Sequence, residues 1–163
     1  MAMAEGAKYE RKYLGHFIDA AFSSASPSYV RLGKDLEEYA IELNPDVESK
    51  TNILGESSTN LKGYSPEGSV DPFYAYKGDP LFEQLAKIAN ERATGADCQT
   101  TVVDVLLDAD GTVEWAYREK VIVVPQSIGG SDGIQIPFNI HYNGERTKGT
   151  FDLTSKQFTA DES

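Results

Sequence analysis

The sequence has little of what most catalytic and metal sites are built from. Of its 163 residues, one is a cysteine, Cys98, and two are histidines, His16 and His141. A single cysteine excludes an internal disulfide framework and suits a reducing compartment. Neither histidine lies near a set of Cys, Asp and His residues with ligand spacing. We therefore predict no metal site and no cofactor.

Long apolar runs and an excess of positive charge are also missing. No stretch of about 18 apolar residues offers a membrane span, and the N-terminus lacks the continuous apolar segment of a secretory signal, so we expect a chain that is cytoplasmic when made. The 26 acidic residues outnumber the 15 basic ones, for a net charge of -11. Ten acidic and only three basic residues lie in 37–83, so the acidity belongs to the folded body. Tight binding to nucleic acid needs a basic footprint that displaces counterions, and this chain has none.

Nucleotide-binding motifs are absent as well. The chain has no phosphate-binding loop and no dinucleotide glycine motif. Asp108-x-Asp110-Gly111 resembles the start of a calcium loop, and Glu119 stands at the twelfth position. An EF-hand, however, needs its glycine at position six, which Val113 occupies, and helical flanks, where strands are predicted. We predict a hairpin turn at 108–111 and no enzymatic activity.

Alternating apolar residues predict strands in the first half of the body. Residues 38–43 place Tyr39, Ile41 and Leu43 on one face, which is typical of a half-buried strand that ends at Asn44-Pro45-Asp46. Residues 57–64 show a weaker strand pattern. Between them, 47–56 is predicted to be an exposed excursion whose Ile53 and Leu54 need a partner, and the Pro- and Gly-containing stretch 65–72 predicts a loop.

One helix is predicted from Asp79-Pro80. Asp79 can accept hydrogen bonds from free amides, and proline is tolerated in the first helical turn because its missing N–H would have no partner there. Gly95 is expected to end the helix. The apolar stripe that would cover a sheet face comprises Leu81, Phe82, Leu85, Ile88 and Ala89.

The second half predicts strands only. Residues 99–107 and 112–124 are β-rich, and Asn143-Gly144 between 134–142 and 145–153 predicts a tight two-residue hairpin. That hairpin would pair Tyr142 with Glu145, His141 with Arg146, and Asn139 with Lys148. Its core face would contain Ile136, Phe138, Ile140, Tyr142 and Phe151, and its wet or interface face Gln135, Asn139, His141, Arg146 and Lys148.

These patterns predict two parts of unequal size. Residues 1–28 form an N-terminal arm that ends in a Ser-rich loop and docks through apolar residues such as Phe17, Ile18 and Phe22 on its own body or a neighbour. Residues 29–163 form a single domain, mainly β, of sandwich or barrel type with one packed α-helix.

Several segments, in their order, resemble the major tail tube proteins of long-tailed bacteriophages and prophages. They are YVRLG at 29–33, ELNPDVE at 42–48, NILGE at 52–56, KGY at 62–64, GDPLFE at 78–83 and QIPF at 135–138. The resemblance implies a tail-tube-like fold and rings, commonly of six subunits, that stack into a hollow tube. Strands of neighbouring subunits would join into one inner barrel, through which DNA passes to the host without specific binding.

The resemblance also implies partners and a location. The partners would be further copies of the chain and the tape-measure, tail-terminator and distal-tail proteins, with no membrane. The location would be the virion tail, after assembly in the host bacterial cytoplasm. The candidate subunit-interface residues are Phe17, Ile18, Phe22, Ile53 and Leu54, for contacts between rings, and Asn139, His141, Arg146 and Lys148, for the boundary within a ring.

Two alternatives remain open at this point. The first is the inner tube of a contractile, phage-derived particle, which would share the fold but deliver no genome. The second is a β-sandwich module that binds a carbohydrate through Trp115, Tyr117 and the aromatic residues Phe73, Tyr74 and Tyr76.

Overall fold

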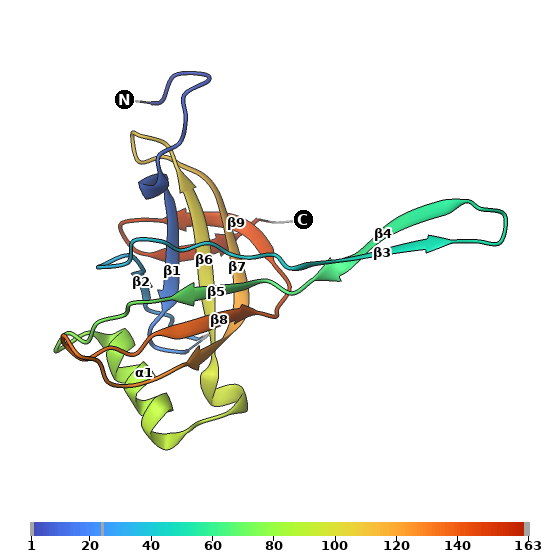
Figure 1. The fold of residues 1–163 in the computed structure, drawn as a ribbon. Coiled ribbons are helices and arrows are strands. Elements are labelled where there is room, and N and C mark those ends of the chain that lie inside the picture. The colour runs from blue at the N-terminus through green and yellow to red at the C-terminus, as the bar shows by residue number, and fades with distance from the viewer. Residues whose placement is uncertain (1, 24, 162–163) are drawn as a thin grey trace.

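A computed structural model describes residues 2–23 and 25–161. Its centre is an eight-stranded antiparallel sheet, with the strand order β10-β9-β7-β6-β1-β2 and with β8 and β5 joined to a second stretch of β7 (Figure 1). A separate two-stranded sheet contains β3 and β4. The described residues thus form a mainly β fold with one α-helix packed on it, as predicted. The strands are β1 (Leu14–Asp19), β2 (Tyr29–Arg31), β3 (Pro45–Thr51), β4 (Ser57–Tyr64), β5 (Glu67–Val70), β6 (Gln99–Leu107), β7 (Val113–Pro125), β8 (Phe138–Tyr142), β9 (Thr147–Asp152) and β10 (Gln157–Ala160).

The long hairpin of β6 and β7 lies at the centre of the sheet and confirms the prediction for this region. Its turn is the one expected at 108–111. The Gly111 N–H donates to the Asp108 carbonyl at 2.9 Å, and the Asp108 N–H donates to the Thr112 carbonyl at 2.8 Å. Gly111 has a φ of 90°, which glycine adopts without a steric penalty. The described residues contain no group of three or more His, Cys, Asp or Glu side chains that could hold a metal ion.

The predicted hairpin between β8 and β9 is wrong. Both strands pair with the same edge of β7, β8 along Val121–Pro125 and β9 along Ala116–Arg118, so they run in one direction. Residues 143–146 bulge opposite Glu119 and Lys120, and the Asn143 N–H donates to the Lys120 carbonyl at 3.2 Å. A Cβ at Gly144 would lie 2.9 Å from the Lys120 backbone nitrogen. The Asn-Gly pair therefore serves a close approach of two backbones and not a chain reversal.

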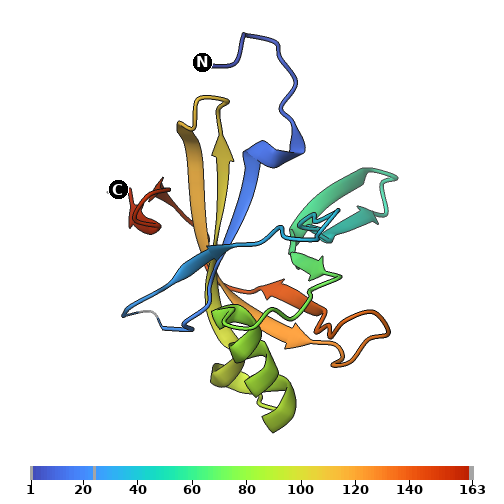
Figure 2. The same cartoon turned by 90° about the vertical axis from the view of Figure 1, so that its left-hand side faces the viewer.

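This bulge also changes which residues share a face. Tyr142 pairs with Val121, and Lys148 pairs with Tyr117. Because Val121 and Tyr117 lie on one face of β7, Tyr142 and Lys148 lie on that face too, and Phe151 lies on the other. Figure 2 shows the consequence: the orange-red β8 leaves the long strands on one side, and the dark red β9 and β10 lie on the opposite side.

Two apolar clusters fill the two faces of the sheet. The larger one includes Ile18, Val102, Val123, Ile136 and Phe138 and is closed by the helix. The smaller one includes Phe17, Val103 and Phe151, and the Phe17 and Phe151 ring centroids are 4.6 Å apart. Phe151 is thus buried as predicted, but in a different cluster from Ile136, Phe138, Ile140 and Tyr142.

Helix α1 (Pro80–Glu91) begins where the sequence predicts. The Asp79 carboxylate accepts a hydrogen bond from the Leu81 N–H at 3.0 Å. Leu81, Leu85 and Ile88 are its buried residues. The helix ends at Glu91, before the expected Gly95, because Arg92 adopts a left-handed conformation with φ 51°. Two 3-10 turns, Arg11–Tyr13 and Gly95–Cys98, flank β1 and β6.

Residues 38–43 do not form the predicted strand. They make only an isolated bridge between Glu42 and Glu67, and Glu67 begins β5, where a loop was expected. Tyr39 is nevertheless buried, and its hydroxyl is 2.7 Å from that of Tyr142. The segment is therefore held by the Tyr39 side chain and by the two backbone hydrogen bonds between Glu42 and Glu67, at 2.8 and 2.9 Å.

The N-terminal arm needs a similar correction. Residues 14–19 form β1, which lies between β6 and β2 in the sheet, and Phe17 and Ile18 are buried in the two clusters. Phe22 packs, half-buried, against the larger cluster. An arm outside the sheet is limited to the residues before β1.

Candidate assembly surfaces

The most exposed apolar side chains lie at the tip of a projecting hairpin. We call residues 45–64, with strands β3 and β4, the hairpin arm; Figure 1 shows it extending away from the body. Ile53 is 102% exposed and Leu54 is 78% exposed. The tip is nonetheless well built, because the Asn52 side-chain oxygen accepts hydrogen bonds from the N–H groups of Leu54 at 2.9 Å and Glu56 at 3.0 Å. The sequence prediction of an exposed excursion is confirmed, although it is a β-hairpin.

The two faces of the hairpin arm differ in charge. On one face, Glu48 forms ion pairs with Lys50, at 3.2 Å, and with Lys62. On the other, the cross-strand pairs Val47–Leu61, Ser49–Thr59 and Thr51–Ser57 carry no charge. An isolated two-stranded hairpin is marginally stable in water. Such a hairpin gains stability when another strand or helix packs against it.

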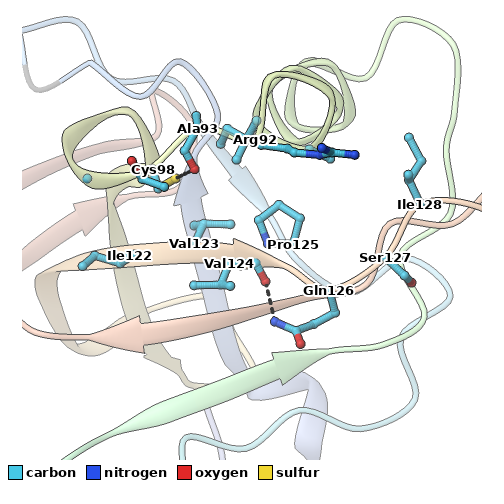
Figure 3. Close-up of a pocket in the computed structure, with 14 residues that line it drawn as sticks. Arg92, Ala93, Cys98, Ile122, Val123, Val124, Pro125, Gln126, Ser127 and Ile128 are labelled. Atoms are coloured by element: carbon cyan, nitrogen blue, oxygen red, sulfur yellow. Dashed lines mark hydrogen bonds between the residues drawn. The ribbon is translucent and has the colours of Figure 1, made fainter.

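An apolar groove lies between the C-terminal end of α1 and the end of β7 (Figure 3). It has a volume of about 480 Å³. Arg92 lies at the groove and belongs to none of the ion pairs found among residues 2–23 and 25–161. The apolar lining of the groove includes Ile88, Cys98, Ile122, Val124, Pro125 and Ile128.

Cys98 contributes packing to this groove and not reactivity. Its side chain is 6% exposed, and its thiol donates to the Ala93 carbonyl at 3.2 Å. Burial raises the pKa of the Cys98 thiol above its ordinary value. Because the thiolate is the reactive form, this environment makes the cysteine inert.

A buried polar cluster joins three strands, β1, β6 and β7, to the β8–β9 bulge. His16 Nδ1 lies 2.6 Å from Asp104 Oδ1. Arg146 reaches Asp104 Oδ2 at 3.0 Å, an ionic contact without hydrogen-bond geometry, and donates to Glu119 Oε1 at 3.3 Å. No sequence pattern indicates this cluster, because its members are far apart along the chain.

The His16–Asp104 pair does not form a catalytic dyad. His16 is 4% exposed, its Nε2 lies 3.1 Å from an Arg11 nitrogen, and its ring stacks on Tyr39 at 4.5 Å. Both ring nitrogens are thus engaged, and burial keeps the pair out of reach of a substrate. The cluster holds strands together.

The predicted boundary residues do not form one surface. Asn139 and His141 lie on β8 beside Val124 and Ile122, on the sheet face that borders the groove. His141 Nδ1 lies 3.5 Å from Glu67 Oε2. Lys148 lies on the opposite face beside Tyr117. Arg146 was expected at the boundary within a ring, but its guanidinium contacts Asp104 and Glu119 of its own chain.

The aromatic residues considered for a carbohydrate platform are also separated. Phe73 packs edge-on against Phe138 at 5.4 Å, in the larger cluster. Trp115 and Tyr117 lie together on β7, with ring centroids 5.5 Å apart. The predicted set therefore offers no single aromatic face.

Comparisons with known proteins agree with the fold. No family model matches the sequence, and no curated protein matches it. Among solved structures, the sheath/tube terminator of an extracellular contractile injection system, PVC, superposes with a TM-score of 0.57 at 9% identity, over 90% of this chain and 100% of that one. The tube-terminating cap of the anti-feeding prophage AFP gives 0.57 at 11% identity, over 91% and 95%. A chain of the PVC sheath–tube complex gives 0.54 at 9% identity, over 88% and 93%.

These superpositions cover almost the whole chain and define a tail-tube-like fold. At such low identity they establish the shared fold alone. No helix among the described residues has the length and hydropathy needed to cross a membrane.

Proposed function

We propose that this chain is a structural subunit whose copies form rings, commonly of six, that stack into the hollow tube of a tail-like particle. The observation that carries the proposal is the match of nearly the full chain to tube-associated proteins, combined with a projecting hairpin arm that makes no use of its apolar tip within the chain. Adjacent, fully exposed apolar side chains are typical of surfaces that contact another molecule. In a tube, the tip lies against another copy.

The charge of the chain suits this role. A net charge of -11 gives DNA no counterion-releasing footprint, so DNA would pass through the lumen without adhering to it. In the particle, the tube would contact tape-measure, terminator and distal-tail proteins. The segments that resemble tail tube proteins of long-tailed phages favour a phage tail, whereas the three solved structures belong to contractile systems. A sheath gene next to the gene for this chain would indicate a contractile particle.

A second candidate is a terminator ring that closes such a tube. Two of the three solved structures above are named as a terminator and a terminating cap. A terminator would form a single ring, and a tube subunit would form stacks. Lys148, which is exposed and lies beside Tyr117, is retained as a boundary candidate, whereas Phe17 and Ile18 are buried inside the subunit.

Negative-stain electron microscopy of the concentrated protein, incubated over several days with and without a crowding agent, tests both candidates. Hollow rods of uniform width are the expected result. Single rings that never stack would favour the terminator. A monomer at every concentration and condition would contradict the proposal.

A further inference from the structure

Resting on the proposed function, we propose that the hairpin-arm tip of one copy inserts Ile53 and Leu54 into the groove between α1 and β7 of a second copy. The two surfaces match in chemistry. The tip offers two aliphatic side chains that are almost fully exposed. The groove is lined by aliphatic side chains, and Ile128 at its edge is 50% exposed. Its volume of about 480 Å³ lies within the range of roughly 300–1,000 Å³ that is typical of binding pockets.

Charge complementarity selects this occupant. Glu56 flanks the tip, is exposed, and accepts a side-chain hydrogen bond only from Asn52 among the described residues, at 3.2 Å. Arg92 stands at the groove, where its left-handed backbone at the end of α1 directs the side chain toward Ile128 (Figure 3). When Ile53 and Leu54 enter the groove, the Glu56 carboxylate comes within reach of the Arg92 guanidinium. The apolar contact and the ion pair then form together.

Two other segments are not available to fill the groove. The chain's own arm projects from the body away from α1 (Figure 1). The N-terminal segment is engaged at the opposite end of the sheet, where the Met3 N–H donates to Asp108 at 2.7 Å and the Tyr9 hydroxyl bonds to Glu114.

The contact is heterologous, because tip and groove are different surfaces of the same chain. Contacts of this type generate closed rings or open stacks when repeated. The proposed contact therefore supplies one of the repeated interfaces that a stack of rings needs.

Disulfide trapping tests the contact directly. In a Cys98→Ser background, Leu54→Cys and Ile128→Cys are combined and the assembled protein is oxidised. A disulfide requires Cα atoms within about 7 Å, so cross-linking reports insertion of the tip. We expect a ladder of dimers and higher species on non-reducing gels. The pair Lys50→Cys and Ile128→Cys, with the first cysteine on the same arm but away from the tip, should give none.

Charge exchange tests the ion pair. Glu56→Arg and Arg92→Glu should each lower the pelleted fraction tenfold or more, and the double variant should restore it. Glu37→Arg, an exposed exchange on the body, is the matched control and should assemble normally. If the wild type assembles but neither the ladder nor the rescue appears, the docking site is wrong and the proposed function stands. If the wild type forms neither rings nor rods, both fall.

Discussion

Gly68 shows how a single residue holds the irregular segment 38–43 in place. It lies on β5 beneath Tyr39, whose hydroxyl bonds to Tyr142 and whose ring stacks on His16. A Cβ at Gly68 would lie 2.6 Å from Tyr39 Cζ, which no rotamer change at position 68 relieves. Tyr39 fits only because β5 has no side chain at this point.

Gly68→Ala should therefore destabilise the protein by about 2 kcal/mol or more, through overpacking and loss of the Tyr39–Tyr142 hydrogen bond. Urea unfolding measures the change. Gly63→Ala on β4 is the control, because no atom lies within 4 Å of its added Cβ, and its effect should stay within about 0.5 kcal/mol. Equal effects of the two substitutions would show that Tyr39 is not fixed by Gly68.

Glu119 gives the buried polar cluster a dependence on pH. Burial raises the pKa of Glu119 above its ordinary value of 4.5, against the opposing effect of Arg146. The folded protein thus binds the Glu119 proton more tightly than the unfolded chain does. By linkage, this group's contribution to stability is complete below about 4.5 and declines as pH rises through the higher folded pKa.

Glu119→Gln should remove that decline. We expect the difference in free energy of unfolding, variant minus wild type, to become more positive as pH rises from about 4 through the folded pKa. Denaturant unfolding at several pH values measures it. A difference that stays constant with pH would mean that Glu119 has the same pKa in both states.

Among the elements, those defined by local periodicity were predictable from the sequence. Strands β6 and β7 carry their own alternation and turn and lie where the pattern places them, and helix α1 begins at its predicted cap. The β8–β9 connection was not predictable, because Asn143-Gly144 suits both a tight turn and a close backbone approach. The choice depends on Lys120, which is distant along the chain.

Of the two candidate surfaces, the sequence likewise predicted one and not the other. The hairpin-arm tip was found from Ile53 and Leu54, two apolar residues in a stretch typical of a loop. The groove combines residues 88–98 of one region with 122–128 of another, so no local pattern reveals it. The same applies to Arg146, whose acidic partners Asp104 and Glu119 lie on two other strands.

The body should fold and keep its stability without the hairpin arm. None of its residues belongs to either apolar cluster. Replacing residues 47–61 by Asn-Gly should therefore leave the thermal unfolding midpoint within about 2 °C of the wild type, since a shift of that size corresponds to at most about 1 kcal/mol. Circular dichroism measures the midpoint.

The same variant should fail to assemble, as measured by sedimentation, because it lacks the apolar tip. A midpoint lowered by more than about 5 °C would show that the arm stabilises the body. Normal rods from the shortened chain would exclude the arm from assembly.

On the scale of the whole molecule, assembly brings together many copies that each carry a charge of -11. Like charges on neighbouring copies repel one another, and salt screens this repulsion, with a Debye length of about 10 Å at 0.1 M. Salt weakens the attraction of the proposed Glu56–Arg92 pair. This loss is small, because there is one such pair per contact and the groove partly encloses it. Apolar insertion of the tip is weakly affected by salt in this range. Repulsion should dominate.

Raising the salt concentration from about 20 to 300 mM should therefore speed assembly and lower the protein concentration at which rods appear. Light scattering follows the rate, and electron microscopy confirms that the product is unchanged. Arg92→Glu lowers the net charge by two further units and removes the pairing cation, so salt should not restore its assembly to the wild-type level. Slower assembly of the wild type at higher salt would mean that ion pairs, and not apolar insertion of the tip, provide most of the attraction between copies.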